Sequence, residues 1–233
     1  MNRITQKSSA AGTAAALAIV FLTVYWGCAW ITSRRGDVGT WYFEWERHIP
    51  FVPVMILPYM SIDALFVAAP FVCRDERERR VFATRIVLAV LVAGACFLLM
   101  PLRLAVDRPA VEGWLGAVFA GLGLVDRPFN LFPSLHIAFS VMLSEVYVRR
   151  SRGLVRVAWV TYFVIVGLST LLTYQHHIID MAGGAVLAGL LLYLVPEALG
   201  DASAGHSPGI LTGWFRPRKV TLWRWLSPAS PIR

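Results

Sequence analysis

Long apolar runs separated by short polar segments dominate the chain. Several of these runs approach the roughly 20 residues that an α-helix needs to cross about 30 Å of hydrocarbon. The fourth run is short and contains Glu145, so its end is the least sharply defined. We therefore predict an all-α, polytopic membrane helix bundle of about six transmembrane helices, near residues 14–31, 51–72, 81–102, 134–148, 154–173 and 178–195.

The composition supports this assignment. Hydrophobic residues make up 57% of the 233 residues and charged residues 15%, whereas a soluble domain is about 45–50% apolar. We expect a single membrane-embedded domain over residues 1–197 and a basic tail over residues 198–233. The Gly, Ser, Pro and Trp residues of that tail are typical of a flexible segment at a membrane interface. The chain shows no internal repeat, which argues against a transporter built from inverted halves.

The net charge of +8 would suit a nucleic-acid-binding protein, but its distribution favours a different explanation. When successive loops are assigned to alternate sides, sixteen of the 22 lysines and arginines fall on one side and six on the other. The positive-inside rule then predicts a cell (inner) membrane protein with both termini cytoplasmic and no nucleic-acid partner. The first span is expected to remain as an anchor rather than a cleaved signal peptide. The loops that contain Arg108, Pro133 and His176 all fall on the outer side.

An aromatic loop, residues 39–50, follows the first span. Because aromatic side chains are typical of the headgroup layer, we expect this loop, with His48, to anchor the chain at the interface. Lipid contact near a substrate entrance is the alternative. The three cysteines have no zinc or redox spacing and are expected to pack within the spans.

Two acidic residues fall inside predicted spans, where charges are rare and often functional. We expect Asp63 to hydrogen-bond a neighbouring helix, and Glu145 to pair with Arg149 four residues later. Neither is assigned a catalytic role.

Three of the five histidines lie in two segments at the edges of predicted spans. Such ionisable residues are costly to keep near hydrocarbon, which favours a functional interpretation. His176 and His177 precede Asp180 by four and three residues, so either imidazole could be oriented by this carboxylate. Spacing alone favours His176 only weakly. The alternative is a polar helix start in which Asp180 binds backbone amides.

The other segment begins with Pro133, a residue suited to the first turn of a helix. Ser134 and the free amides of that turn would form an anion site at the positive end of the helix dipole, with His136 beside it. A capped helix start is the alternative. Arg103 and Arg108 precede this segment, and a guanidinium matches phosphate oxygens, although each could also be a surface charge. Arg127 is a further candidate of the same kind.

These segments together resemble the type 2 phosphatidic acid phosphatase superfamily of membrane enzymes. That family has three motifs in this order: KxxxxxxRP, PSGH and SRxxxxxHxxxD. The resemblance covers roughly residues 102–195, the expected catalytic core. The matching residues are Arg108-Pro109 for the first motif, Pro133-Ser134-Leu135-His136 for the second, and Ser169, His176 and Asp180 for the third.

The chain departs from the motifs at three positions. The lysine of the first motif is Pro101, and Arg103 is our candidate replacement. Leu135 replaces a glycine and Thr170 replaces an arginine of the third motif. In the last two departures, the chain resembles the branch that contains inositol phosphorylceramide synthases. Those enzymes transfer a phosphorylated headgroup to an alcohol.

The resemblance implies a role for each candidate residue. His176 would attack phosphorus, Asp180 would orient it, and His136 would protonate the leaving oxygen and then activate the acceptor. Arg108, Ser134 and Arg103 would hold the phosphoryl oxygens. No metal and no cofactor would be required, in keeping with chemistry that needs mainly positioning and charge stabilisation.

Three functions follow as hypotheses. The favoured one is a lipid phosphate or pyrophosphate phosphohydrolase that acts at the outer membrane face. The second is a phosphotransferase of the inositol phosphorylceramide synthase type, and the third is a non-catalytic lipid-binding or transport protein. A zinc site at the histidines is a further alternative, but it would leave Arg108 unexplained.

Overall fold

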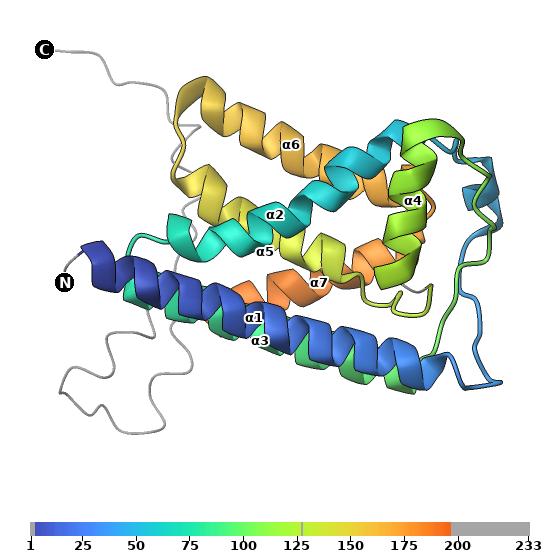
Figure 1. Ribbon diagram of the computed structural model, residues 1–233, viewed down its shortest axis with the longest axis horizontal. Helices are drawn as coiled ribbons and strands as arrows, with labels where there is room; N and C mark the ends of the chain where they lie inside the picture. Colours follow the sequence, from blue (N-terminus) through green and yellow to red (C-terminus); the bar gives the residue numbers. More distant parts are fainter. Residues whose placement is uncertain (1–2, 127, 197–233) are drawn as a thin grey trace, which may run out of the picture. The chain divides into compact units, whose positions relative to one another are not determined.

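The computed structural model describes residues 3–126 and 128–196, and these residues fold into helices without a β-strand. The predicted all-α bundle is therefore confirmed for this part of the chain (Figure 1). The predicted basic tail over residues 198–233 and the candidate Arg127 lie outside the described residues.

All six predicted spans form helices. Polar caps set several boundaries: Asp75 accepts a hydrogen bond of 2.9 Å from the Glu78 amide at the start of one helix, and Ser134 caps another. The first helix begins well before its apolar run, where Ser9 bonds Glu76 at 2.9 Å. The helices are α1 Arg3–Thr32, α2 Ile56–Val72, α3 Glu76–Leu99, α5 Leu135–Arg149, α6 Gly153–Leu172 and α7 Ile178–Leu194.

Four of these helices are long and apolar enough to cross a membrane, namely those over Gln6–Thr32, Pro53–Val72, Glu76–Leu99 and Gly153–Leu172. The other two predicted spans form shorter helices: α5 has 15 residues, as its short apolar run indicated, and α7 has 17. Exposed apolar side chains such as Leu154, Val157 and Val164 cover α6, which suits contact with lipid.

Two further helices were not predicted: the short 3-10 helix η1 Glu44–His48 and α4 Gly113–Val125. A second 3-10 helix, η2 Pro53–Met55, leads into α2 within the predicted span 51–72. α4 has 13 residues, too few for a span, and it lies across the direction of its neighbours (Figure 1). It packs on α2 through an apolar cluster of Ile56, Tyr59, Phe119 and Leu122.

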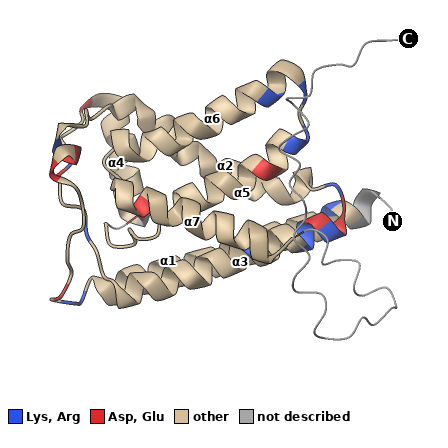
Figure 2. Cartoon of the chain, turned by 180° about the vertical axis from the view of Figure 1, so that it is seen from behind, with Lys and Arg blue, Asp and Glu red and all other residues tan. Residues whose placement is uncertain are grey.

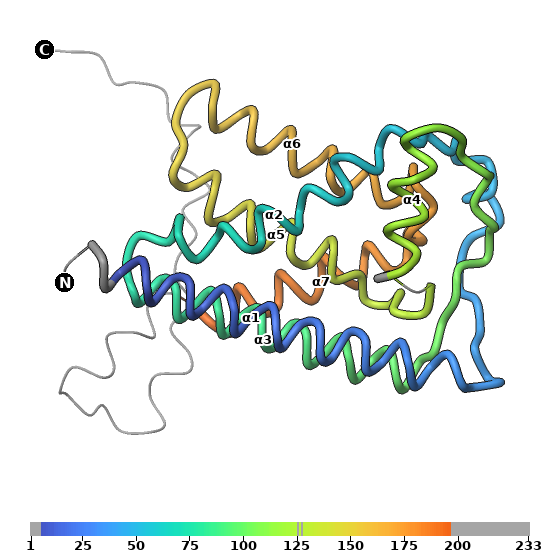
Figure 3. The backbone as a smooth tube through the Cα atoms, viewed as in Figure 1, coloured from blue at the N-terminus to red at the C-terminus, as the bar shows by residue number. Residues whose placement is uncertain are grey.

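α5 lies at the centre of the bundle, in contact with α2, α3, α6 and α7 (Figure 3). Its small and medium-sized side chains, including Ala138, Met142 and Leu143, are almost completely buried. A helix that is covered on all sides can present a polar residue to a protected interior rather than to lipid. The N-terminal end of α5, which carries His136, is placed in this way.

Charged residues gather near the two ends of the helices (Figure 2). At one end, an ion pair between Arg150 and Glu78 joins the α5–α6 turn to the first turn of α3. The predicted pair of Glu145 with Arg149 is confirmed at 2.6 Å, and Glu145 also pairs with Arg85. We call this the arginine-rich end.

The opposite end, which we call the site end, is built from three loops: residues 33–55, 100–112 and 173–177. Gly39 and Leu102 form an isolated parallel bridge, and the Val52 amide donates to the Leu172 carbonyl at 2.8 Å. The aromatic loop does expose Trp41 and Trp45, as an interfacial anchor would. However, the same loop also packs against the histidine segments, which the sequence interpretation did not anticipate.

Candidate active site

The starts of α5 and α7 are fastened to each other. The Ser134 amide donates to the Asp180 carbonyl at 2.9 Å. Gly184 permits this approach, because a Cβ atom there would lie 2.3 Å from the Ser134 carbonyl oxygen. The two histidine segments, about forty residues apart in the sequence, therefore meet in space.

The loop between α6 and α7 is tightly folded. The Thr170 carbonyl accepts hydrogen bonds from the amides of Gln175 at 2.9 Å and His176 at 3.2 Å. Tyr174 has a left-handed backbone with φ of 50°, and its hydroxyl donates to the Ile49 carbonyl at 2.6 Å. Such a conformation persists where the surroundings determine it, and it often occurs at functional sites.

The two candidate catalytic histidines lie close together. The ring centroids of His136 and His176 are 6.2 Å apart, with 54° between the ring planes. His136 also stacks on Tyr59, at 4.0 Å and 12°. The Nε2 atom of His136 is buried without a hydrogen-bond partner among the described residues.

Asp180 lies behind His176. Its Oδ2 atom is 3.6 Å from His176 Nδ1 and accepts a 2.8 Å hydrogen bond from the His177 amide. The carboxylate thus also caps α7, which was the alternative interpretation of this residue. The distance to His176 exceeds that of a hydrogen bond, and contacts of this kind often tighten only when substrate binds. The arrangement leaves Nε2 as the nitrogen of His176 directed away from Asp180.

His177 has a different environment, which spacing alone did not reveal. Its Nδ1 atom is 2.9 Å from Glu46 Oε2, and its Nε2 atom accepts a 3.2 Å hydrogen bond from the Ala105 amide. Both ring nitrogens are therefore engaged. The ring of His176 is less constrained, because its Nδ1 atom has no hydrogen-bond partner within the described residues.

Arg108 reaches the same loop. Its Nη2 atom donates to the Gln175 side-chain oxygen at 3.0 Å and to the Tyr174 carbonyl at 3.4 Å, and its guanidinium lies 5.5 Å from the centre of the Phe119 ring. Burial lowers the pKa of the Arg108 guanidinium from its ordinary value, but arginine remains a cation in proteins. Arg108 thus places a positive charge on the loop segment that directly precedes His176.

The other two predicted phosphate ligands are Arg103 and Ser134, and their hydrogen bonds do not reach His176. Arg103 is exposed, and its backbone amide donates to the Gly39 carbonyl at 2.9 Å. Ser134 is completely buried, and its hydroxyl oxygen accepts a 3.3 Å hydrogen bond from the Ile137 amide. The amides of Leu135 and His136 lie in the first turn of α5, where a helix leaves donors without intrahelical partners.

Several residues near His136 were not identified from the sequence. The Tyr59 hydroxyl donates to Asp126 at 3.1 Å, Tyr25 donates to the same carboxylate, and Asn130 donates to the Tyr25 carbonyl at 2.7 Å. Glu46, which contacts His177, was also not identified. No local sequence signal marks these residues, because their partners lie far away along the chain.

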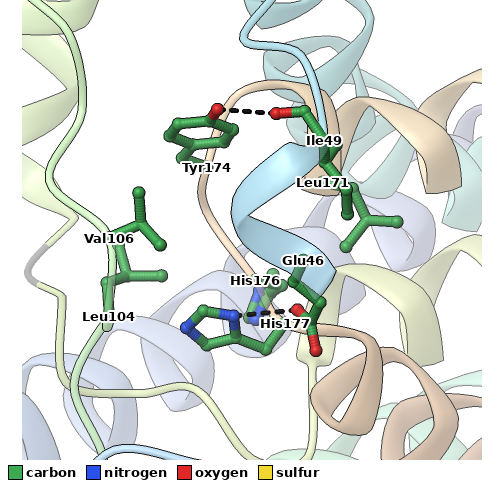
Figure 4. A pocket seen from close by; sticks show the side chains of 8 residues that line it. All are labelled: Glu46, Ile49, Leu104, Val106, Leu171, Tyr174, His176 and His177. Carbon is green, nitrogen blue, oxygen red and sulfur yellow. Dashed lines mark hydrogen bonds and ion pairs between the residues drawn. The ribbon is translucent and has the colours of Figure 1, made fainter. Parts of the chain in front are cut away.

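A small cavity opens beside His176 at the site end (Figure 4). Glu46, His176 and His177 form the polar part of its wall, and Tyr174 with aliphatic side chains from two loops and the end of α6 forms the rest. The lining residues are Glu46, Ile49, Leu104, Val106, Leu171, Tyr174, His176 and His177. Among the described residues, no group of three or more His, Cys, Asp or Glu side chains could hold a metal ion.

The fold and this site define a helical membrane protein in which two histidines, a carboxylate and an arginine converge. The chain belongs to the PAP2 superfamily, whose family model matches residues 37–194. Comparison with curated proteins finds no match. Members of the superfamily are phosphatases and phosphotransferases, so membership supports phosphoryl transfer as the class of reaction.

Proposed function

We propose that this protein hydrolyses a lipid phosphate or pyrophosphate through a phosphohistidine intermediate. The approach of His136 and His176 to 6.2 Å, with Asp180 behind His176, carries the proposal. Two imidazoles at this separation can serve one phosphoryl group, one as nucleophile and one as proton donor.

In the first step, His176 Nε2 forms a bond to phosphorus while the bond from phosphorus to the leaving oxygen breaks. His136 gives its proton to that oxygen. Asp180 stabilises the positive charge that develops on the His176 ring. Arg108 and the first amides of α5 hold the phosphoryl oxygens, since this reaction depends on positioning and charge stabilisation.

In the second step, the phosphohistidine is hydrolysed. His136, now neutral, takes a proton from a water molecule whose oxygen forms a bond to phosphorus while the bond from phosphorus to nitrogen breaks. Inorganic phosphate leaves, and both histidines return to their starting protonation states. A positioned acid or base typically contributes about 10²–10⁴-fold to such a rate.

We propose further that the site faces the outer side of a cell (inner) membrane, with both termini cytoplasmic. The excess of arginine at the opposite end of the bundle supports this orientation, because positive residues are enriched on the cytoplasmic side. The substrate is accordingly a lipid that presents its phosphate at the outer leaflet.

A phosphotransferase of the inositol phosphorylceramide synthase type is the second candidate, and position 170 favours it. Thr170 is buried, and its hydroxyl donates to the Gly167 carbonyl at 2.7 Å. The arginine that the superfamily motif has at this position is therefore not replaced by another cation. Leu135 supports the same candidate. An alcohol would then take the place of water in the second step.

A lipid phosphate panel separates these candidates. The full-length protein in detergent is given short-chain phosphatidic acid, a polyprenyl pyrophosphate or phosphatidylinositol, each with and without alcohol acceptors, and His176→Ala serves as the blank. We expect phosphate release that the acceptors do not suppress. Headgroup transfer that outcompetes water would favour the phosphotransferase, and the absence of both activities would refute both enzyme functions.

A further inference from the structure

Glu46 is a buried acid in an otherwise exposed segment. It is 5% exposed, whereas the side chain of Glu44, in the same short helix η1, is 80% exposed. A buried carboxylate must be paired or well supplied with hydrogen bonds to be tolerated. Its position therefore requires specific partners.

Three N–H groups supply those hydrogen bonds. The Phe43 amide donates to Glu46 Oε1 at 2.9 Å. The Ile178 amide lies 3.2 Å and His177 Nδ1 lies 2.9 Å from Glu46 Oε2. The carboxylate thus joins η1 to the start of α7, directly after His176 and two residues before Asp180.

His177 carries this connection further. With Glu46 as an acceptor at Nδ1, the imidazole bears its proton there, and the bare Nε2 accepts the Ala105 amide at 3.2 Å. Ala105 lies three residues before Arg108, and His177 directly follows His176. The bonds from Glu46 to Ala105 therefore join the loop of the nucleophile to the loop of the phosphate-binding arginine.

We propose that Glu46 is a positioning residue, which acts through His177 to hold His176 at a fixed position relative to Arg108. This proposal rests on the proposed function. It predicts that Glu46 affects the rate of the chemical step, although its hydrogen bonds go to Phe43, His177 and Ile178 rather than to His136 or His176. Figure 4 shows Glu46 joined to His177 beside His176.

Glutamine cannot substitute for Glu46 in this setting. Its amide offers only one oxygen, so its NH2 group must face either the Phe43 amide or the pair formed by His177 and Ile178. If the His177 proton moved from Nδ1 to Nε2, Nδ1 could accept a hydrogen bond from the glutamine NH2 group. The N–H group at Nε2 would then face the N–H group of Ala105. One buried donor is left unsatisfied in either arrangement.

The test compares Glu46→Gln with its matched control Glu44→Gln, both full-length in detergent with short-chain phosphatidic acid as substrate. We expect kcat of Glu46→Gln to fall by about 10- to 100-fold, as a lost charged hydrogen bond would produce. KM should change by less than about threefold, and the amount of folded protein should be close to wild type. Glu44→Gln should retain wild-type kcat.

The double variant identifies the route of the effect. If Glu46 acts through His177, Glu46→Gln combined with His177→Asn should be no slower than the slower single variant. Should Glu46→Gln not fold, His177→Asn breaks the connection at its other end: its amide can still donate to Glu46, but it has no atom in the place of Nε2 to accept the Ala105 amide. A fall in kcat is therefore expected for this variant too.

Three results would overturn the proposal: wild-type kcat in Glu46→Gln, wild-type kcat in His177→Asn, or losses in the double variant that multiply. A wild-type protein without phosphate release or headgroup transfer on any lipid would refute the proposed function, and this inference with it. An active wild type with an unaffected Glu46→Gln variant would refute the inference alone.

Discussion

At the residue scale, the two histidines that we propose as catalytic differ in what lies behind each ring. Asp180 lies 3.6 Å from His176, whereas His136 lies flat against Tyr59. A carboxylate suits a nucleophile that must become positively charged, and a stacked aromatic ring fixes an acid in orientation without adding charge. These surroundings support the proposed division of roles.

Tyr59 provides a test of the stacking role. Tyr59→Phe keeps the ring and loses only the hydrogen bond to Asp126, so we expect kcat within about threefold of wild type. Tyr59→Leu removes the ring on which His136 rests, and we expect a loss of about tenfold or more. Phosphate release from short-chain phosphatidic acid measures both.

Equal losses in the two Tyr59 variants would show that the hydroxyl, rather than the ring, supports His136. The melting temperature of each purified variant serves as the control, because Tyr59 is only 2% exposed and its replacement by leucine also changes core packing.

The sequence identified some of these residues and could not identify others. His136, His176, Asp180 and Arg108 were found because polar residues at the edges of apolar spans and the family motifs both mark them. Spacing could not separate His176 from His177, since that distinction depends on partners far away along the chain. Glu46 is 131 residues from His177, and Tyr59 is 67 residues from Asp126.

At the element scale, two glycines at the start of α7 bring the histidines together. A Cβ atom at Gly183 would lie 2.5 Å from the Phe132 ring, and one at Gly184 would lie 2.3 Å from the Ser134 carbonyl oxygen. The Phe132 side chain has some freedom to move, but the backbone at Ser134 does not. Gly184 is thus the stricter requirement.

Gly184→Ala should therefore separate α7 from α5. We expect a loss of about 1–3 kcal/mol in stability, typical of overpacking, and a clear fall in phosphate release as His136 and His176 move apart. Gly189→Ala is the matched control in the same helix, where a Cβ atom meets nothing within 4 Å. Thermal unfolding and phosphate release measure the two effects.

The account of the α5–α7 contact would be wrong if Gly184→Ala were as stable and as active as Gly189→Ala. Alanine forms helices better than glycine, so the control should melt at or above the wild-type temperature.

The helices themselves were largely predictable, because apolar runs of transmembrane length mark them directly. α4 was missed because its 13 residues are too few for a span. The early start of α1 was missed because its first turns are polar and are stabilised by tertiary contacts such as that of Ser9 with Glu76. The site end could not be predicted, since its three loops are joined by isolated hydrogen bonds without periodicity.

At the scale of the whole molecule, the bundle separates an arginine-rich end from a site end. The α5–α6 turn and the first turn of α3 meet at the first, as the pair of Arg150 with Glu78 shows. The loops that carry Arg108 and His176 meet at the second. The difference in positive charge between the two ends is the basis of the proposed orientation in the membrane.

Cysteine labelling tests that orientation. In a background with Cys28, Cys73 and Cys96 replaced by alanine, we expect Glu44→Cys to react with a membrane-impermeant maleimide on intact cells. Arg152→Cys, at the start of α6, should react only after permeabilisation. The reverse pattern would place the site on the cytoplasmic side.

The central claim is that His176 carries the phosphoryl group. Full-length wild-type protein and its His176→Ala variant are mixed with ³²P-labelled short-chain phosphatidic acid, quenched within the first turnover and analysed for acid-labile, alkali-stable label on the protein. The account predicts label on wild type, located at His176, and none on His176→Ala. Label of equal amount on His176→Ala, or undiminished phosphate release by that variant, would contradict it.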